Sequence, residues 1–263
     1  MSNIITIKLK GGLGNFLFQV ATGYAYSLRY NKSLILDIND VYVAHQNILS
    51  YKDNIFSKLN FVNSNITYNN FYQEKSFSFN DIPFFGGSVK LDGYFQTEKY
   101  FYTYKEQLIE LFDFGITTTE KIKNKYKSFL NQKTCSVHIR RGDYLKHPDI
   151  HPTLSISYYN EAINYFDNDT TFLFFSDDID WCKQSFSTLD KKVLFIQDNT
   201  DFEDLYLMTI CNNNIICNST FSWWGAWLNK NDNKKVIMPN LWFGNKLKHY
   251  NTDDLCCDGW IKI

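Results

Sequence analysis

The sequence predicts an α/β protein whose β-sheets are parallel and doubly wound. Short β-branched runs alternate with amphipathic helical segments from residue 135 onward, a pattern typical of strands linked by crossover helices. The amino terminus opens with the same order of strand, helix and strand. The chain of 263 residues is long enough for one large domain or two modest domains, and no internal repeat or low-complexity linker interrupts it.

The opening unit contains a glycine-rich turn, KGGLGN, between a strand at residues 4–9 and a helix whose apolar positions begin at Leu17. Residues 33–37 are expected to form the next strand. Gly12 and Gly14 allow a sharp turn or a close approach to a ligand, and the helix amino terminus behind them favours negative charge. A tight turn without a ligand is an equal alternative, because the spacing is neither GxGxxG nor a Walker motif.

The segment from about residue 40 to residue 131 has a weaker pattern. Asparagine-rich and aromatic-rich stretches at residues 63–70 and 77–85 are expected to form loops and short strands. Helices are expected at residues 104–111 and 120–130. The second of these helices is rich in lysine, which predicts a solvated face leading into a second domain.

The second half has a regular order of elements. We expect strands at residues 135–140, 171–175, 193–196, 215–217 and 235–238, the last of them stopped by Pro239. The helices between them begin near Ser157, near residue 178, at the capping box of Thr200 and Glu203, and at residue 223. The three tryptophans of the last helix are expected to pack in the core.

Composition and charge limit the possible partners. Hydrophobic residues make up 44% and charged residues 21%, which is ordinary for a globular protein. A formal net charge of -1 gives no broad positive field for nucleic acid, so any anion recognition must be local. No apolar run is long enough for a membrane span or a signal peptide, and the six cysteines lack metal spacing. We therefore expect a cytoplasmic protein, with peripheral attachment at the inner membrane left open.

The sequence CSVHIRRGDY, at residues 135–144, carries the most chemistry. Ligands collect beyond the carboxyl ends of parallel strands, so Arg140, Arg141 and Asp143 are expected at such an edge. Strand alternation places His138 and Arg140 on one face. A planar guanidinium matches phosphate oxygens, although an ion pair with Asp143 or Asp177 is the alternative for both arginines. His138 could equally be a hydrogen-bonded core histidine.

Polar groups follow the ends of four expected strands, at residues 140–143, 176–178, 197–198 and 218–222. These ends lie on the same edge of a parallel sheet. Ser219, Thr220 and Ser222 at a helix start favour an anion site, although each alone is more typical of a helix cap. Asp204 could accept hydrogen bonds from a nucleobase, with a helix-dipole role as the alternative. The Asp178-Ile179-Asp180 sequence opens a helix, and we assign it no metal.

Four segments together resemble the bacterial α-1,2-fucosyltransferases of glycosyltransferase family 11: KGGLGNFLFQVATGYAYS, HIRRGDYL, FFSDDIDWCK and DLYLMTICNNNIICNSTFSWWGAWLN. The resemblance runs over residues 10–229 in matching order. It implies a GT-B-like fold of two Rossmann-like domains with parallel sheets facing across a cleft. Residues 1–131 would form the acceptor-side domain and residues 132–263 the GDP-fucose-binding domain, with a carboxyl-terminal tail able to pack back on the first.

The resemblance also implies an activity. It is the inverting, metal-independent and cofactor-independent transfer of L-fucose from GDP-fucose to the 2-hydroxyl of a galactose-terminated oligosaccharide, in O-antigen or oligosaccharide biosynthesis. The alternatives are a GDP-sugar transferase with another linkage or acceptor, and a nucleotide-binding or glycan-binding module without turnover. The identity of the acceptor glycan and the oligomeric state stay open.

Residue roles carry over position by position. Arg140 would hold the diphosphate, and Asn15 and its glycines would lie across the cleft near the phosphate and acceptor. Asp204, together with residues 219–222, would bind GDP. Asp143 is the favoured base, with Asp149 and His151 as alternatives. The catalytic candidates are Arg140, Asp143 and Asn15. The binding candidates are Gly12, Gly14, Asn15, His138, Arg140, Arg141, Ser176, Asp177, Asp204, Asn218, Ser219, Thr220 and Ser222.

The sequence departs from the family pattern at two positions. Phe16 stands where glutamine usually follows GGLGN, and Asn213 stands where histidine is common. The first departure puts a polar contact from that position in doubt. The second falls outside the expected chemistry.

Overall fold

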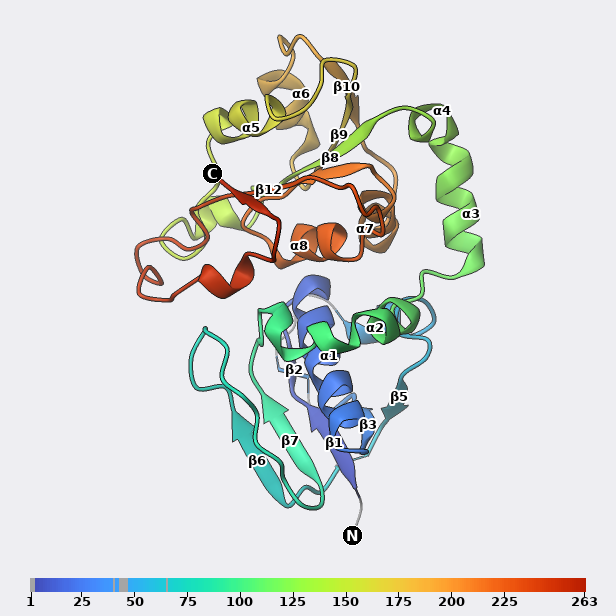
Figure 1. Ribbon diagram of the computed structural model, residues 1–263, viewed down its shortest axis with the longest axis vertical. Coiled ribbons are helices and arrows are strands. Elements are labelled where there is room, and N and C mark those ends of the chain that lie inside the picture. Colours follow the sequence, from blue (N-terminus) through green and yellow to red (C-terminus); the bar gives the residue numbers. More distant parts are fainter. Residues whose placement is uncertain (1–2, 40, 43–46, 65) are drawn as a thin grey trace. The chain divides into compact units, whose positions relative to one another are not determined.

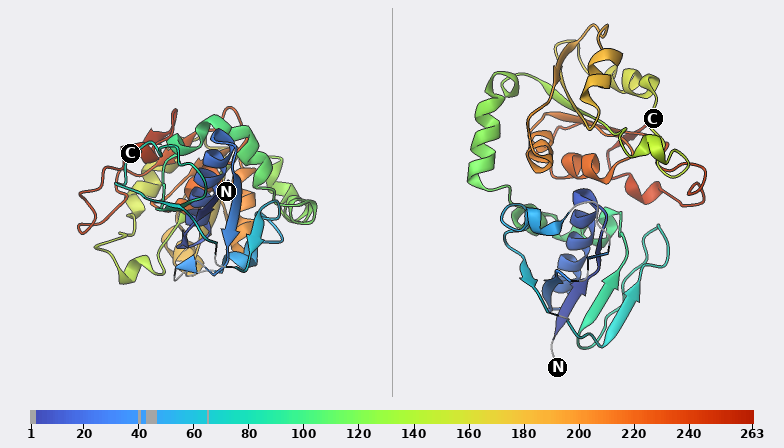
Figure 2. Two further views of the ribbon diagram at one scale, coloured as in Figure 1. Left: turned by 90° about the horizontal axis from the view of Figure 1, so that it is seen from below. Right: turned by 180° about the vertical axis from the view of Figure 1, so that it is seen from behind.

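A computed structural model describes residues 3–39, 41–42, 47–64 and 66–263 (Figures 1 and 2). The chain divides into two compact units. The first unit contains residues 1–115 and 250–255, and the second contains residues 116–249 and 256–263. The first unit therefore ends at Gly115, earlier than the expected boundary near residue 131.

The first unit is built on a parallel sheet of five strands in the order β5-β3-β1-β7-β6. Their bounds are β1 Ile4–Ile7, β3 Ser33–Asp37, β5 Asn60–Val62, β6 Asn70–Gln73 and β7 Val89–Asp92. A second, two-stranded parallel sheet pairs β2 (Leu9–Lys10) with β4 (Val41–Tyr42). Helix α1 (Leu13–Arg29) packs on β1 and β3. The predicted strand, glycine turn, helix and strand at the amino terminus are confirmed.

Short helices complete the first unit. They are the 3-10 helices η1 Ile48–Tyr51, η2 Glu98–Tyr100, η3 Tyr102–Tyr104 and η5 Asp253–Leu255, and the α-helix α2 Lys105–Leu111. The segment at residues 250–255 joins this unit through Asp254. Its carboxylate lies 2.5 Å from Lys99 Nζ and accepts a hydrogen bond of 2.7 Å from the Phe79 backbone N–H.

The second unit is built on a parallel sheet of six strands in the order β10-β9-β8-β11-β12-β13. The strands are β8 Thr134–Ile139, β9 Thr171–Ser176, β10 Lys192–Phe195, β11 Asn213–Ile215, β12 Val236–Met238 and β13 Ile261–Lys262. Helices α5 (Ile156–Ile163) and α6 (Ile179–Ser185) cover one face, and α7 (Asp201–Thr209) and α8 (Thr220–Trp227) cover the other (Figure 1). The 3-10 helix η4 (Tyr144–Lys146) follows β8. The predicted doubly wound sheet is confirmed.

The burial of apolar residues explains why helices cover both faces of the second sheet. Every residue of β8 is buried, as expected for a central strand covered by helices on both faces. Its Val137 packs with α5 and α6 in one apolar cluster. On the other face, Trp223, Trp224 and Trp227 of α8 are buried, which confirms that these tryptophans belong to the core.

Helices α3 (Ile116–Lys125) and α4 (Lys127–Leu130) belong to the second unit. The lysines at positions 121 and 125 of α3 are exposed, which confirms the expected solvated face, and both also contact residues in or just before α7. Lys121 Nζ lies 2.5 Å from Glu203 of α7. Lys125 Nζ donates to the carbonyl oxygens of Gln197 and Asp198 and to Asn199 Oδ1, at 3.1, 3.2 and 2.7 Å. These lysines hold α3 against the turn that precedes α7.

Within the ranges described above, no helix is long and apolar enough to cross a membrane.

Candidate functional site

The loops that follow neighbouring strands of the second sheet form the candidate site. β8 lies between β9 and β11, so residues 140–143, 176–178 and 218–222 emerge from three adjacent strands. Residues 197–198 follow β10, which pairs with β9. The parallel register brings the predicted polar strand ends to one edge of the sheet.

Arg140 follows β8 directly and is held by two carboxylates. Its Nη2 lies 2.7 Å from Asp143 Oδ1, and its Nε donates to the same oxygen at 2.8 Å. Nε also lies 3.2 Å from Asp177 Oδ2. Burial alone would lower the pKa of Arg140, but Asp177 and Asp143 raise it and the net direction is upward. The side chain is 37% exposed, so a fixed cation faces solvent at this edge.

Asp177 shapes the turn that carries Arg140. Its two carboxylate oxygens accept the backbone N–H groups of Arg141 and Gly142, at 2.9 and 3.0 Å. A Cβ atom on Gly142 would lie 2.6 Å from Asp177 Oδ2, so the glycine allows this close approach. Ser176 Oγ accepts the Asp178 N–H at 3.0 Å and orders the neighbouring loop. The Asp177 carboxylate and the Ser176 hydroxyl hold these loops in place.

Arg141 is held away from Arg140. Its Nε donates to Asp178 Oδ2 at 3.0 Å, and its guanidinium lies 3.8 Å from the ring centroid of Trp181. Its side chain is 16% exposed. An ion pair is therefore the arrangement found for Arg141, with Asp178 in place of the Asp143 or Asp177 named from the sequence. Asp178 also caps α6 by accepting the Trp181 N–H at 3.3 Å.

His138 is buried and faces α8. Its Nδ1 lies 3.1 Å from Cys217 Sγ, and its ring packs 5.4 Å from that of Phe221. Burial, followed by the charge of Arg140, lowers the pKa of His138 to about 3. The imidazole is neutral at physiological pH and belongs to the core. The expected substrate contact from His138 is not supported by this placement.

The amino terminus of α8 lies beside the Arg140 loop. Ser219 is the N-cap residue but forms no side-chain cap hydrogen bond. Ser222 is buried, and its Oγ donates to the Ser219 carbonyl oxygen at 3.3 Å, so its hydroxyl points into the protein. Thr220 is partly exposed. Any anion contact here therefore falls to Ser219, Thr220 and the backbone of the first turn, with no part for the Ser222 hydroxyl.

Tyr144 connects Arg140 to the α8 segment. Its hydroxyl donates to the Asn218 carbonyl oxygen at 2.9 Å, and the Arg140 guanidinium lies 5.9 Å from its ring centroid. The Tyr144 ring also stacks on the ring of His151, with ring centroids 5.1 Å apart. This tyrosine was missed from the sequence, because an aromatic residue after a charged turn gives no signal beyond ordinary packing.

Asp204 lies on the first turn of α7. Its Oδ1 accepts a hydrogen bond of 2.8 Å from Asn199 Nδ2. Burial is the largest influence on the carboxyl and raises its pKa to about 6, although Asn199 opposes the shift. A helix amino terminus alone would favour the charged carboxylate and lower its pKa. Because the pKa of Asp204 is raised, desolvation is the larger effect at this position. Carboxyls perturbed in this way are enriched at functional sites.

The model of the family described as "Glycosyl transferase family 11" matches residues 1–263. The chain belongs to glycosyl transferase family 11. An Escherichia coli relative named "Alpha-1,2-colitosyltransferase" is 35% identical, over 99% of both chains. "Galactoside alpha-(1,2)-fucosyltransferase 1" of Homo sapiens is 25% identical, over 66% of this chain and 52% of the human protein.

Solved structures support the fold of this family 11 transferase. The fucosyltransferase NodZ from Bradyrhizobium matches with a TM-score of 0.57 and 11% identity, covering 86% of this chain and 92% of NodZ. POFUT1 in complex with GDP matches with a TM-score of 0.54 and 12% identity, covering 89% and 97%. At these identities the matches show the fold alone. The fold is α/β and GT-B-like, with one large parallel sheet in each unit.

The candidate bases of the family 11 chain lie in different surroundings. Both bonds from Arg140 use Asp143 Oδ1, and Asp143 Oδ2 receives no bond from the described residues, while the side chain is 49% exposed. His151 is partly buried, which lowers its pKa, and its Nδ1 has no partner among the same residues. Asp149 is exposed. Asp143 alone among the three adjoins the fixed guanidinium directly.

The glycine turn of the first unit precedes and begins α1. Gly12 is the N-cap residue of α1, and Asn15 Oδ1 accepts a hydrogen bond of 2.9 Å from Gln96 Nε2. Gly11 has φ +90°, and a Cβ atom there would lie 2.2 Å from Asn15 Nδ2. Gly14 is buried at the start of α1. The turn therefore holds Asn15 in a defined orientation, and its contact with a substrate stays a prediction.

The two departures from the family pattern have structural roles. Phe16 is fully buried in α1, so no polar contact arises from its side chain. Asn213 begins β11, where its Oδ1 accepts the Lys235 N–H at 2.8 Å and fixes the edge of β12.

Asn218 ties together the loops behind the site. It is buried, and its Nδ2 donates to the carbonyl oxygens of Pro152 and Trp242, at 2.9 and 3.1 Å. We expect Asn218→Ala to lower the free energy of unfolding by about 2–4 kcal/mol, because two buried carbonyl groups lose their donor. Urea unfolding followed by circular dichroism measures this change. The exposed Asn240→Ala variant is the control, and an equal loss in both variants would contradict the assignment.

Proposed function

We propose that this chain transfers L-fucose from GDP-fucose to the 2-hydroxyl of a terminal β-galactoside, with inversion and without a divalent cation. The observation that carries the proposal is Arg140. Two carboxylates fix this guanidinium at the sheet edge, beside the amino terminus of α8. The named activities of the family relatives agree with this reaction class.

Charge development in the reaction explains the role of Arg140. When the bond between sugar and GDP breaks, negative charge grows on the β-phosphate and positive charge grows on the sugar ring. A guanidinium held in advance stabilises the leaving diphosphate without reorganising at the moment of reaction. Ser219, Thr220 and the backbone N–H groups at the start of α8 would contact the same diphosphate.

Asp143 would act on the acceptor. One of its oxygens orients Arg140, and its Oδ2 is left to take the proton of the attacking 2-hydroxyl. Attack on the face opposite the diphosphate inverts the anomeric carbon. Asn15 and its glycine turn are proposed to contact the acceptor and the phosphate from the first unit.

Asp204 would recognise the guanine base. Guanine presents neighbouring N–H donors, and a carboxylate accepts two of them at once in a planar arrangement. The desolvation that raises the pKa of Asp204 strengthens such charge-assisted bonds when the base is bound.

A second donor, GDP-activated colitose, is favoured by the colitosyltransferase relative that spans the whole chain. Colitose differs from fucose by the loss of one ring hydroxyl. A site that hydrogen-bonds this hydroxyl would discriminate strongly between the donors, whereas an apolar contact there would accept both.

A donor screen tests the proposal. Release of GDP is measured from GDP-fucose, GDP-colitose and GDP-mannose, each with and without lactose, and the product linkage is determined by NMR. We expect acceptor-dependent release from GDP-fucose and a new α-1,2 linkage to galactose. A preference for GDP-colitose would change the proposed donor but leave the proposed reaction class unchanged. Binding of GDP without release from any donor, across a galactoside panel, would indicate a module without turnover.

A further inference from the structure

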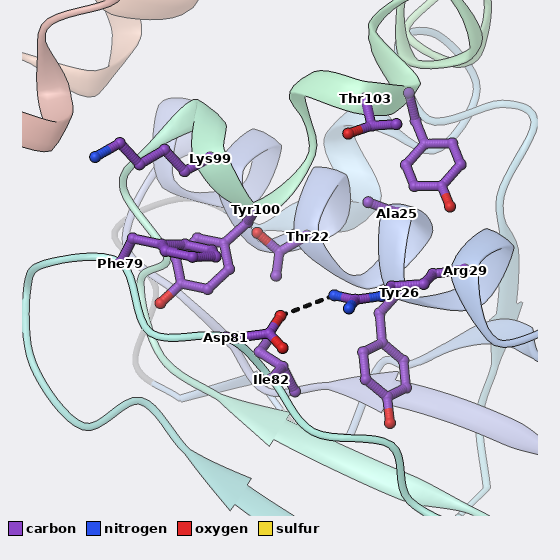
Figure 3. Close-up of a pocket in the computed structure, with 11 residues that line it drawn as sticks. Thr22, Ala25, Tyr26, Arg29, Phe79, Asp81, Ile82, Lys99, Tyr100 and Thr103 are labelled. Atoms are coloured by element: carbon purple, nitrogen blue, oxygen red, sulfur yellow. Dashed lines mark hydrogen bonds and ion pairs between the residues drawn. The ribbon is translucent and has the colours of Figure 1, made fainter.

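The first unit contains a cavity on the side of α1, away from the glycine turn (Figure 3). Its volume is about 200 Å³, and its walls come from α1, from residues 79–82 and from residues 99–104. Thr22 is ten residues beyond Gly12, which corresponds to about 15 Å along the helix axis. The cavity is therefore separate from the turn that holds Asn15.

Thr22 supplies an unsatisfied hydrogen-bonding group to this cavity. Its side chain is 1% exposed, and its Oγ1 has no partner among the described residues. Figure 3 shows Thr22 projecting from α1 between Tyr100 and Ala25. Two of the tyrosine hydroxyls in the cavity wall already have hydrogen-bond partners. Tyr26 donates to the Pro83 carbonyl oxygen at 3.0 Å, and Tyr100 accepts the Asn80 N–H at 3.2 Å. A buried hydroxyl without a partner is costly, and a bound ligand can satisfy it.

The charges at the cavity rim are paired within the first unit. Arg29 Nη1 lies 2.8 Å from Asp81 Oδ1, as the dashed line in Figure 3 marks. Lys99 Nζ lies 2.5 Å from Asp254 Oδ1. Because each cation already has its own carboxylate, the rim offers polar hydrogen-bonding groups without a net charge for an ionic ligand.

The aromatic walls favour a ligand with an apolar face. Phe79 is 37% exposed, and its ring centroid lies 4.9 Å from that of Tyr100. A ring that carries hydroxyls at its edge and C–H groups on its face matches such a surface, which combines aromatic contact with polar groups. The volume of about 200 Å³ is below the range of about 300–1,000 Å³ typical of larger ligand pockets. It suits one sugar unit better than a nucleotide sugar.

We propose that this cavity is a secondary carbohydrate subsite that binds a neutral sugar unit of the acceptor glycan other than the unit that receives the transferred sugar. The Thr22 hydroxyl hydrogen-bonds the bound sugar, and Phe79 and Tyr100 contact its apolar face. The inference rests on the proposed function for the identity of the glycan, whereas the cavity and its unsatisfied hydroxyl stand independently of turnover.

Binding in the absence of donor tests the subsite. A galactose-terminated tetrasaccharide, and separately galactose, glucose and N-acetylglucosamine at high millimolar concentration, are titrated while the Thr22 methyl NMR signal is followed. We expect this signal to shift with the tetrasaccharide and with at least one monosaccharide. Thr22→Val should weaken tetrasaccharide binding about three- to tenfold, because one hydrogen bond is lost. The same variant should unfold at a slightly higher temperature, since the buried hydroxyl is removed.

A second variant tests whether the loss of binding comes from the cavity itself and not from a change in the core around Thr22. Thr103 lines the cavity from an exposed position, so Thr103→Trp is expected to fill the cavity without disturbing the core. It should weaken tetrasaccharide binding about tenfold and leave transfer to lactose unchanged. The exposed Thr117→Trp, in the second unit, is the matched control and should bind as the wild type does.

The outcomes separate the two proposals. The subsite would be overturned if the Thr22 methyl signal did not shift with any sugar. It would also be overturned if the wild type, Thr22→Val and Thr103→Trp bound the tetrasaccharide with equal affinity. Either result would count against the subsite even if the protein transfers fucose from GDP-fucose. If the Thr22 signal shifts and both variants bind the tetrasaccharide more weakly, but the protein transfers no sugar, the carbohydrate subsite stands and the proposed reaction is wrong.

Discussion

Arg140→Lys is expected to lower kcat by about 10²–10³, the cost typical of removing one preorganised donor from a developing anion. Lysine keeps the positive charge but loses the planar fork. In the wild type, the contacts to the carboxylates of Asp143 and Asp177 come from Nε and Nη2 of Arg140, which form one edge of the guanidinium. The guanidinium can therefore be held on one edge while it binds phosphate with the other. A single ammonium group cannot do both.

Steady-state kinetics with GDP-fucose and lactose measure this loss, and thermal unfolding checks that the fold survives. Arg141→Lys is the matched comparison, because the neighbouring arginine bonds Asp178 and lies against Trp181. We expect it to cost stability and to lower kcat less than tenfold. Equal kinetic losses in the two variants, or turnover by Arg140→Lys close to the wild-type value, would remove Arg140 from the proposed mechanism.

The fold could be predicted because local patterns and topology agree. Strand and helix periods alternate through the second half, and such units have few arrangements other than a parallel sheet. The first half gave a weaker signal after residue 40. Its remaining strands are short, with β5 and β6 only three and four residues long, and short strands among asparagines and aromatics resemble loops in sequence. The contacts that Lys121 and Lys125 of α3 make near α7 were not predicted, because no local pattern contains such distant partners.

The gathering of polar strand ends at one edge of the sheet could be predicted, whereas the burial and the contacts of the individual residues could not. Adjacent strands bring Arg140 and the α8 segment to one edge, as the parallel sheet implies. Burial then separates residues that look equivalent in sequence. Ser222 and His138 are turned into the protein, whereas Arg140 stays partly exposed. Tyr144 and Asn218 act through contacts with residues more than sixty positions away, and such contacts leave no trace in the spacing of a motif.

Asp204→Asn is expected to stabilise the free protein and to weaken GDP binding. The pKa of Asp204 is raised to about 6, so the folded state binds its proton more tightly than the unfolded state does. The stability that this group contributes is present below the unfolded pKa of about 4 and is lost as the pH rises through 6. At pH 8 we expect the asparagine variant to be more stable than the wild type by about 2–3 kcal/mol, and near pH 4 the difference should vanish. Urea unfolding at the two pH values measures both differences.

GDP binding should change in the opposite direction. If the Asp204 carboxylate accepts two guanine N–H groups, its replacement by an amide removes charge-assisted bonds and should raise the Kd for GDP about 10²-fold at pH 8. In the wild type, GDP affinity should increase as the pH rises through 6, because binding requires the ionised carboxylate. The asparagine variant should lose that pH dependence, and titration calorimetry across this range measures it.

Asp201→Asn on the same helical turn provides the control for this pair of effects. Asp201 lies in the first turn of α7, where a negative charge favours the helix dipole, so its replacement should lower stability by about 0.3–1 kcal/mol. GDP affinity should stay within about twofold of the wild-type value, since no charge-assisted bond to the base is lost. Stabilisation by Asp204→Asn with unchanged GDP affinity would show that the carboxyl is buried for a reason other than nucleotide recognition. Weakened GDP binding without stabilisation would place Asp204 at the base while contradicting its raised pKa. The two measurements together thus separate the burial of this carboxyl from its proposed contact with guanine.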